Sequence, residues 1–455
     1  ARLKKACAIT NAKAGVLDPH IADAIAKACD LLLAGKYHEQ FIVDPIQGGA
    51  GTSINMNANE VIANRGNAIA GAKLLHPNDD VNMSQSSNDT FPTAMHIAGV
   101  LSIRRQLIPA LGRLIDTMER LERENQGIIK SGRTHLQDAT PIRFSQEISG
   151  WRGMLEVNRG QLEAAVNGLR SLAIGGTAVG TGINAPKGFD VAVAGILSGL
   201  TGETFYADEN KFHALTSKHE LVFAHGALKA LAADLMKIAN DIRWLASGPR
   251  LGLGEITIPE NEPGSSIMPG KVNPVIPEVV NQVAFRIAGN DVTISMAVEA
   301  GQFELNAFEP VVFDALFQSI NILEKAVRTF TVNCVDGITA NEEALFCKEI
   351  GMDLIITENG YTYRREDVFT MDLEALQHDI DRELYIREHL RSCGRALRAG
   401  VNLKGYFYWS AMDCWESSRG YGYPMGLVGI NFDTLERIPR DSFYYYQKVI
   451  ANNMV

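Results

Sequence analysis

The sequence predicts a mainly α-helical protein built on a bundle of long helices, with a smaller α/β segment at its C-terminal end. Apolar residues recur with the period of an α-helix over long stretches of the first three quarters of the chain. Ten of the 12 tyrosines, by contrast, lie after residue 360. This change of composition indicates that the chain divides near residue 350 into two regions of different fold.

Two long runs carry the helical pattern. The first extends to about Asn125 and would reach roughly 28 Å at about 1.5 Å per residue, and the second is of similar length. Both predict long helices packed together in a bundle. The apolar positions step by three and four residues, at Leu107, Leu111, Leu114, Met118 and Leu121 in the first run and at Leu228, Leu231, Leu235, Ile238, Ile242 and Leu245 in the second.

Short β-rich segments follow the break. Leu354–Thr357 and Gly405–Trp409 are typical of strands, and a helical stretch from about Leu373 to Gly400 separates them. This βαβ order predicts an α/β segment. The expected organisation is a helical region at residues 1–90, a central helical bundle at 91–345 and a C-terminal segment at 346–455.

The composition is that of a globular protein and excludes several classes. Of the 455 residues, 46% are hydrophobic and 21% charged, which is enough for a large core without disulfides or metals. The formal net charge of −10 argues against a surface for nucleic acid or anionic membrane. Because no apolar stretch approaches the roughly 18 residues of a membrane span, and no apolar signal core follows the first residues, we expect a cytoplasmic protein.

The six cysteines are scattered along the chain. They form no CxxC pair and have no metal-ligand spacing, which predicts buried free thiols and no structural zinc. They are Cys7, Cys29, Cys334, Cys347, Cys393 and Cys414.

The most informative polar string is the loop 264–274, Gly-Ser-Ser-Ile-Met-Pro-Gly-Lys-Val-Asn-Pro, ahead of a helix predicted to start near Pro277. Glycines at 264 and 270 allow close approach and unusual backbone angles, and Lys271 adds a positive charge. Free backbone N–H groups in such a loop can bind an anion. The alternative is a mobile surface turn, because these residue types are common in loops.

Three further polar clusters lie in apolar helical surroundings. Residues 48–57 combine a glycine-rich turn with amides and hydroxyls suited to holding a small carboxylate, and residues 84–90 are similar. Either could instead be a helix cap, since Ser, Thr, Asn and Asp are the preferred N-cap residues. The third cluster, 132–138, places His135 beside a hydroxyl and an arginine, although a lone histidine is more often structural.

Together these four strings resemble the aspartase/fumarase superfamily over roughly residues 1–345. The loop 264–274 is similar to the signature loop of that family, and the other clusters match its remaining active-site regions in order. The resemblance implies a helical subunit of a homotetramer in which three subunits build each active site. It implies a small dicarboxylate substrate and no cofactor, and the expectation is that no metal takes part.

The resemblance also implies residue roles in an anti elimination through an aci-carboxylate intermediate. The base would be Ser265, and a serine hydroxyl can act so only where its anion is strongly stabilised. His135 would contact a carboxylate and be oriented by Glu278. Lys271 and Asn273 would hold the substrate, while its carboxylates and leaving group would be bound by Thr52, Ser86, Ser87, Asn88 and Thr134.

Two activities compete within this superfamily. Segments 47–57, 277–283 and 300–306 look like aspartate ammonia-lyase, whereas 76–95 and 237–263 look at least as much like class II fumarase. The first set flanks the active-site strings, so deamination of L-aspartate to fumarate is the preferred prediction and fumarate hydration the alternative. A non-catalytic helical scaffold is the third hypothesis, since the family's N-terminal segment and small C-terminal helical domain are expected to be missing.

The C-terminal segment resembles glycoside hydrolase family 1 over about residues 352–453. The strand ending in Thr-Glu-Asn-Gly would carry that family's nucleophile at Glu358, and Glu416 would lie near a sugar-binding position. A retaining glycosidase needs a second carboxyl about 5 Å away, on an earlier barrel strand that we expect to be absent. Asn261-Glu262-Pro263 looks like the motif that carries the acid/base carboxyl in that family, but it leads directly into the loop at 264. β-Glycosidase activity is therefore not predicted.

The join of two families has two explanations: one polypeptide made by fusion, or two polypeptides whose sequences have been combined. A single peptide that bridges Asn341 and Glu358 would establish one polypeptide.

Overall fold

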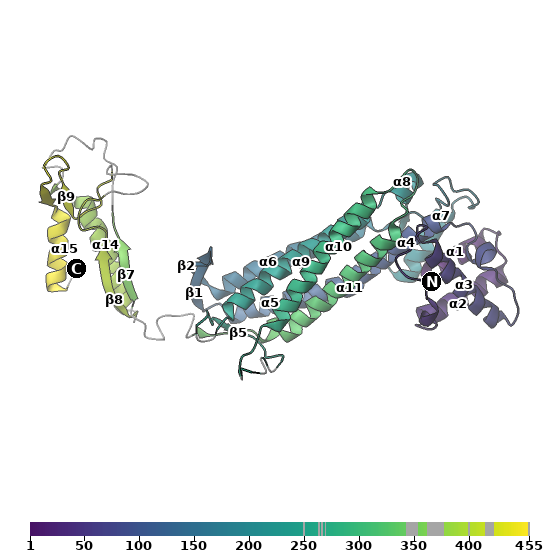
Figure 1. The fold of residues 1–455 in the computed structure, drawn as a ribbon, viewed down its shortest axis with the longest axis horizontal. Coiled ribbons are helices and arrows are strands. Elements are labelled where there is room, and N and C mark those ends of the chain that lie inside the picture. Colours follow the sequence, from purple (N-terminus) through teal and green to yellow (C-terminus); the bar gives the residue numbers. More distant parts are fainter. Residues whose placement is uncertain are drawn as a thin grey trace. The chain divides into compact units, whose positions relative to one another are not determined.

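The computed structural model forms two compact units, Ala1–Asn341 and Glu342–Val455, which are treated separately (Figure 1). It describes residues 1–248, 251–262, 264, 267–268, 270–342, 354–361, 377–398, 401–414 and 423–453.

The first unit is built on long helices that run side by side (Figure 1). The helices predicted from the two apolar runs are confirmed as parts of α5 and α9. The α10 helix begins at Val275, close to the start predicted from the sequence. The bundle helices are α5 (Ile108–Glu124), α6 (Phe144–Gly168), α9 (His219–Leu245), α10 (Val275–Glu299) and α11 (Glu309–Asn333).

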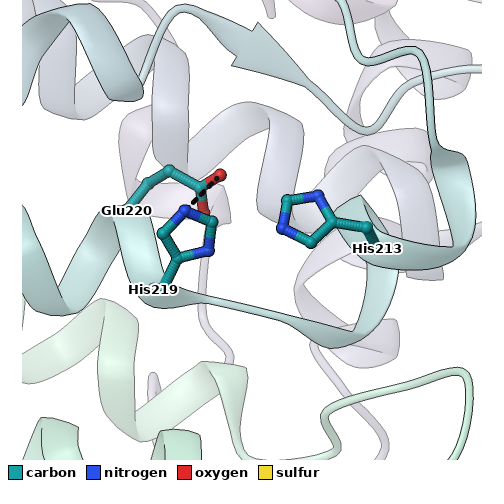
Figure 2. Close-up of side chains that lie close together, drawn as sticks. All are labelled: His213, His219 and Glu220. Atoms are coloured by element: carbon teal, nitrogen blue, oxygen red, sulfur yellow. Dashed lines mark ion pairs between the residues drawn. The ribbon is translucent and has the colours of Figure 1, made fainter.

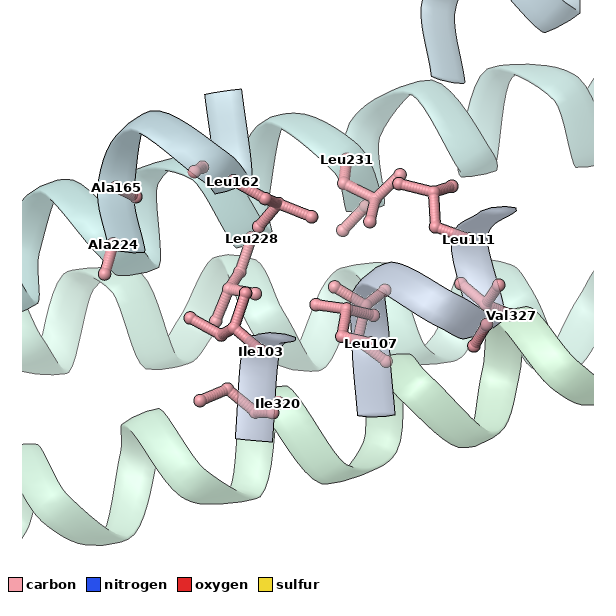
Figure 3. Close-up of a cluster of buried hydrophobic side chains, with 14 of the residues drawn as sticks. Ile103, Leu107, Leu111, Leu162, Ala165, Ala224, Leu228, Leu231, Ile320 and Val327 are labelled. Carbon is pink, nitrogen blue, oxygen red and sulfur yellow. The ribbon is translucent and has the colours of Figure 1, made fainter. Parts of the chain in front are cut away.

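One continuous apolar core fills this bundle. Residues three and four apart on each helix lie on one face, so Leu107 and Leu111 point inward together with Leu228 and Leu231, and all four are fully buried (Figure 3). At roughly 25 cal/mol per Å² of buried apolar surface, such a core is the main stabilising contribution to the unit.

Shorter helices surround one end of the bundle. They are α1 (Arg2–Lys13), α2 (Pro19–Leu33), η1 (His38–Gln40), α3 (Thr52–Ala70), η2 (Pro77–Val81), α4 (Ser87–Ser102), η3 (Ile103–Leu107), α7 (Phe189–Thr201) and α8 (Lys211–Thr216). A second, smaller core joins α2 to α3 through Ile25, Leu32 and Ile62. The π-helical turn η3 carries α4 directly into α5. A short 3₁₀ turn, η4 (Val335–Gly337), follows α11.

Strands in the first unit are short and paired. The antiparallel hairpin of β1 (Ile129–Thr134) and β2 (Gln137–Arg143) turns at His135 and Leu136, which both have positive φ, 55° and 60°. Both residues thus have the backbone sign of a type I′ hairpin turn. The other pairs are β3 (Ser171–Leu172) with β4 (Tyr206–Ala207), parallel, and β5 (Ile256–Thr257) with β6 (Thr339–Ala340), antiparallel.

The second unit contains the predicted strand, helix and strand. β7 (Leu354–Asn359) and β8 (Leu403–Tyr408) pair in parallel, and α14 (Ile380–Arg398) connects them along the chain. The predicted helix start at Leu373 and the candidate Glu416 lie outside the described residues. The unit ends with the antiparallel pair β9 (Val428–Ile430) and β10 (Arg437–Pro439), followed by α15 (Asp441–Asn452).

Two ion pairs lie inside the second unit. Arg382 Nη1 is 2.9 Å from Asp379 Oδ2, and Arg440 Nη2 is 2.7 Å from Asp413 Oδ2, with all four side chains almost fully buried. The Asp379 carboxylate also accepts from the backbone N–H and hydroxyl of Ser442, at 2.9 and 2.5 Å. These bonds tie the start of α14 to the start of α15.

Two chain-wide expectations can be compared with the described residues. Within those ranges, no helix is both long and apolar enough to cross a membrane. The described cysteines are free thiols: Cys7, Cys29 and Cys334 are buried, whereas Cys393 and Cys414 are partly exposed. Burial raises the pKa of the Cys29 thiol to about 11 and that of Cys334 to about 12. Cys347 lies outside the described residues.

Candidate functional site

The four polar clusters do not meet within one chain but lie at opposite ends of the bundle. Residues 48–57 and 84–90 start α3 and α4, where Phe91 packs against Phe313 near the start of α11, with ring centroids 5.8 Å apart. The hairpin β1–β2 and the start of α10 lie at the other end (Figure 1). Because α10 has 25 residues, the two ends are separated by roughly 37 Å at about 1.5 Å per residue.

At the first end, the N-termini of α3 and α4 converge. Thr52 Oγ1 lies 3.0 Å from Ser87 Oγ, and Thr52 also donates to the carbonyl of Gly49 at 2.6 Å. Gly51 has a φ of 80°, and a Cβ there would lie 2.4 Å from the Phe91 ring, so only glycine fits this turn. Two adjacent helix N-termini favour an anion, and the Ser87 hydroxyl beside Thr52 can turn toward a bound carboxylate.

Part of this cluster does act as a helix cap. Ser86 is the N-cap of α4, where its side chain accepts from the backbone of Asn88 at 3.2 Å and the Asp89 carboxylate accepts from the backbone N–H of Ser86 at 2.9 Å. The Asn88 side chain donates to Ala178 O at 2.8 Å. The capping interpretation is therefore confirmed for Ser86, while Thr52 makes no cap bond for α3.

Asp89 is a site residue that sequence reasoning missed. Its carboxylate is fully buried and accepts from the backbone N–H groups of Gly175 and Thr177, both at 3.0 Å. Burial raises the pKa of Asp89 to about 6, against the lowering effect of these bonds. Asp89 thus fixes the start of α4 to the 175–178 loop.

Lys4 is a second residue that the sequence patterns did not indicate. Its ammonium donates to Asn82 Oδ1 and Gln85 Oε1, both at 2.9 Å, although the side chain is almost fully buried. Burial lowers the pKa of Lys4 to about 8. Asn82 Oδ1 also accepts from Asn55 and Asn59, at 3.1 and 3.2 Å. This network holds α1, α3 and the segment before α4 together beneath the converging N-termini.

At the second end, Thr134 and His135 lie exposed at the tip of the hairpin. The hairpin is anchored at its base: Arg133 pairs with Glu255 Oε1 at 2.5 Å, and buried Lys130 pairs with Glu147 at 2.7 Å and with Glu255 at 2.9 Å. Hydrogen bonding to Glu255 raises the pKa of Arg133. Arg133 therefore holds the base of the hairpin in place, with His135 exposed at its tip.

The signature loop is described in part. Ser265, the predicted base, lies outside the described residues, as do Ser266 and Pro269. Gly264 and Gly270 have φ values of 78° and 80°, and a Cβ on Gly264 would lie 1.7 Å from the Lys271 carbonyl oxygen. The unusual backbone angles expected at both glycines are confirmed, and the close approach is found at Gly264. Lys271 is exposed and Asn273 half-buried.

Glu278 lies in the first turn of α10. Its carboxylate is 3.8 Å from Arg243 Nη2 near the end of α9. No hydrogen bond or ion pair joins it to His135 within the described chain, so the predicted orienting contact is not made in a single subunit. The pairing of His135 with Glu278 stays a prediction for the assembled protein.

In the second unit, Glu358 is exposed near the end of β7. Its neighbour Asn359 accepts from the Tyr406 hydroxyl at 2.7 Å. Among the residues the structure describes, none makes an ion pair or hydrogen bond with the Glu358 carboxylate. The described carboxylates Asp379 and Asp413 of this unit are each held by a buried arginine, so neither is available as a second catalytic carboxyl.

Two protein-family models match the chain, one within each unit. Residues 1–289 match the protein-family model described as "Lyase", and residues 344–455 match the model described as "Glycosyl hydrolase family 1". The resemblance of the first unit to a lyase family is thus confirmed, and the C-terminal resemblance agrees with a family-model match over that segment alone.

The names of similar proteins indicate one activity within the family matched by the first unit. The chain is 54% identical over 347 residues to "Fumarate hydratase class II" of Bacillus subtilis and 53% identical over 350 residues to the protein of that name in Helicobacter pylori. These stretches cover 75% and 76% of the chain and the same shares of the relatives. The preference for aspartate ammonia-lyase is not supported by these names, which agree with the alternative, class II fumarase.

Solved structures give the same fold. A class II fumarase from Schistosoma mansoni matches with a TM-score of 0.74 and 38% identity, and a fumarate lyase:delta crystallin from Brucella melitensis bound to cobalt matches with a TM-score of 0.74 and 47% identity. Each match covers 76% of this chain and 76% of the other. The chain belongs to the lyase family and is a lyase of the aspartase/fumarase superfamily.

Proposed function

We propose that the protein is a fumarate hydratase of the class II type, which adds water across the double bond of fumarate to give L-malate and catalyses the reverse reaction. The observation that carries the proposal is the 54% identity to the class II fumarate hydratase of Bacillus subtilis over 347 residues. The family match at 1–289 includes all four polar clusters, so the residues needed for the chemistry belong to the matched part of the chain.

The separation of the clusters supports the proposal that neighbouring chains complete each site. Roughly 37 Å of helix lies between the two ends of one subunit, far more than a four-carbon substrate spans. The α10 helix also exposes Phe285, Val292 and Met296, which are seven and four residues apart and 59% to 66% exposed. An apolar stripe of this kind is suited to packing against another helix. We therefore propose a homotetramer in which antiparallel contact of bundles brings opposite ends together.

The first end would bind one carboxylate of the substrate. Thr52 and Ser87 place two hydroxyls 3.0 Å apart, at the point where two helix N-termini converge. The Ser87 hydroxyl can donate to a carboxylate oxygen, and Thr52 can do so only in exchange for its bond to the Gly49 carbonyl, while the positive ends of the helix dipoles favour the anion. Ser86 contributes chiefly by capping α4, and Asn88 by fixing the 175–178 loop.

The second end would carry the proton transfer. In dehydration, Ser265 as an alkoxide would take the proton from the carbon next to one carboxylate, which becomes an aci-carboxylate dianion. The hydroxyl on the neighbouring carbon would then leave as water after it gains a proton. Lys271, Asn273 and the backbone N–H groups of the loop would stabilise the dianion, because fixed donors act most strongly on charge that develops in the transition state.

Thr134 and His135 would complete the site from the hairpin. An exposed imidazole at a hairpin tip whose base is locked by Glu255 can contact the substrate held by another chain. Glu278 would orient that imidazole once chains assemble, in place of its 3.8 Å approach to Arg243.

The test is an assay of the purified full-length protein with L-malate and, separately, with L-aspartate, followed by the ultraviolet absorbance of fumarate. We expect fumarate from L-malate and a far slower reaction with L-aspartate. Ser265→Ala should lower kcat by about 10²–10⁴-fold, the usual contribution of a positioned base. Ser392→Ala, which changes an exposed serine of the second unit, serves as the matched control and should keep full activity.

Two results would refute the proposal. Faster turnover of L-aspartate than of L-malate would restore the ammonia-lyase interpretation. Full activity in Ser265→Ala would exclude the serine-base mechanism for either substrate.

A further inference from the structure

We propose that His213, His219 and Glu220 form a binding site for a divalent transition metal of the Zn²⁺ type. The three residues lie where the short helix α8 passes into the long helix α9 (Figure 2). One ligand atom from each lies within 4.8 Å of the others. None of them belongs to the residues proposed to act on the dicarboxylate, so the inference is independent of the proposed function.

The donor set selects the class of ion. Two imidazole nitrogens and one carboxylate oxygen suit Zn²⁺ and its neighbours in the first transition row, whereas Ca²⁺ and Mg²⁺ prefer oxygen alone. A tetrahedral ion with bonds of about 2.1 Å needs donors about 3.4 Å apart. His219 Nε2 and Glu220 Oε1 already lie 3.4 Å apart, and the imidazole rings of His213 and His219 have centroids separated by 5.2 Å. The ligand atom of His213 lies within 4.8 Å of the other two, so binding requires this ring to move toward them.

A neighbouring hydroxyl orients the imidazole of His219. Ser217 Oγ lies 3.0 Å from His219 Nδ1, so when Nδ1 donates to this hydroxyl, Nε2 keeps its lone pair on the side of Glu220. Asp208 Oδ2 lies 3.8 Å from His213 Nδ1, too far for a hydrogen bond, and is itself held by the hydroxyl of Ser171 at 2.7 Å, so the hydrogen-bonded support is that of His219. Hydrogen bonds to the second ring nitrogen are the usual support of metal-binding histidines, since they fix the tautomer and the ring plane.

The turn that carries the ligands is rigidly anchored. The buried Lys218 ammonium donates to the carbonyls of Ala214 and Leu215 at 3.0 and 2.8 Å, closing the C-terminal end of α8, and pairs with buried Glu309 of α11 at 2.9 Å. Thr216 Oγ1 donates to the carbonyl of Phe303 at 2.6 Å. Because folding fixes this backbone without an ion, little conformational entropy is lost when the ion binds.

The exposure of the two histidines and the charge of Glu220 are also consistent with a metal site. The side chains of His213 and His219 are 39% and 62% exposed, so an ion can enter from solvent and a water molecule can fill a fourth position. Glu220 is only 12% exposed and supplies the negative charge. The alternative is a structural ion pair between protonated His219 and Glu220. Such a pair would form without any contribution from His213 or Ser217.

The test is binding of Zn²⁺ to the full-length protein after treatment with a chelator, measured by equilibrium dialysis with metal analysis. We expect one more equivalent per chain in the wild type than in the double variant His213→Ala/His219→Ala, a difference that removes any background binding to thiols elsewhere. Each single histidine variant should weaken binding by about 100-fold, and Ser217→Ala by about tenfold. His20→Ala, an exposed histidine on α2, is the matched control and should change nothing.

A spectroscopic measurement separates the site from an ion pair. Co²⁺ bound to nitrogen and oxygen donors in four-coordinate geometry should give visible absorption bands in the wild type that are lost in His219→Ala and in His213→Ala. Circular dichroism should confirm that each variant folds. Equal metal content in the wild type and the double variant, or Co²⁺ bands that persist without His213, would overturn the proposal.

Discussion

The two units of the chain bury their interiors in different ways. In the first unit, residues such as Leu111, Leu228 and Leu231 form one continuous aliphatic core along the long helices. In the described part of the second unit, Ile386 and Leu427 are the buried Ile and Leu side chains, and the interior is held largely by the arginine pairs of Asp379 and Asp413. A bundle closes around its own apolar stripes, whereas two parallel strands cannot close a core by themselves.

The strands of the second unit show what such a sheet leaves uncovered. Parallel strands are usually buried on both faces, yet Ile355 of β7 and Phe407 of β8 are 51% and 59% exposed. A cavity of about 450 Å³ lies beside the same strands, lined by Ile356, His389 and Tyr406 among others. Within the described residues, β7 pairs with β8 alone, so a matching nucleophile strand is weak support for glycosidase activity.

Substitution of one glutamate in each unit tests which unit carries the chemistry. Glu278→Gln should lower the rate of L-malate dehydration by about 10²-fold, because the neutral amide cannot orient and charge-stabilise His135 as a carboxylate does. Glu358→Gln is the matched change in the second unit and should leave the rate within about twofold, a change too small to reflect lost chemistry. Loss of activity in Glu358→Gln alone would contradict the assignment of the chemistry to the first unit.

A buried ion pair should matter most to the stability of the second unit. Arg440→Met removes the partner of Asp413 and leaves a buried carboxylate unpaired, which should cost about 3–5 kcal/mol. Urea unfolding should show the second unit's transition at a lower denaturant concentration, with the first unit's unchanged. Arg391→Met removes an exposed pair with Glu388 and should shift the transition by no more than about 1 kcal/mol.

Truncation of a buried leucine should destabilise the first unit and leave the second unit unchanged. Leu228→Ala empties part of the bundle core and should lower the free energy of unfolding of the first unit by about 2–5 kcal/mol. Leu251→Ala, a fully exposed leucine of the same unit, is its control. An equal effect of both changes would show that the bundle core is not the source of the unit's stability.

The smallest effect concerns pH. Burial raises the pKa of Glu309 to about 7, above its ordinary value of 4.5. The folded state therefore binds this proton more tightly than the unfolded state, so this group's contribution to the free energy of unfolding falls as pH rises from about 4.5 to about 7. Glu309→Gln should flatten the pH dependence of the first unit's unfolding in that window. Glu304→Gln, at an exposed position, is the control and should leave this pH dependence as it is in the wild type. An unchanged pH dependence in Glu309→Gln would refute the assignment of this titration to Glu309.

How much the sequence could predict differs between fold and site. The helices around Leu107 and Leu228 were predictable because a period of 3.6 residues places their leucines on one buried face. The β1–β2 hairpin was not, since its turn uses His135 and Leu136 at positive φ, where glycine or asparagine is the usual signal. The order of the clusters along the chain likewise gave no hint that they lie at opposite ends of the bundle.

Some site residues needed the structure to be found. Asp89 lies inside the polar string that starts α4, but only the fold brings the 175–178 loop to its carboxylate. His213 and His219 do not have a familiar metal-ligand spacing, and the turn between α8 and α9 is what brings their side chains together. Cysteine spacing gives no information on this histidine cluster.

The central claim is that catalytic sites are completed by opposite ends of different chains. It is tested most directly by mixing two inactive variants, Ser265→Ala and Thr52→Ala/Ser87→Ala, after partial unfolding and reassembly, with native mass spectrometry to confirm mixed oligomers. The account predicts that mixed oligomers regain up to about a quarter of wild-type fumarase activity, because that share of sites draws both ends from unaltered regions. Mixed oligomers with no regained activity would contradict it.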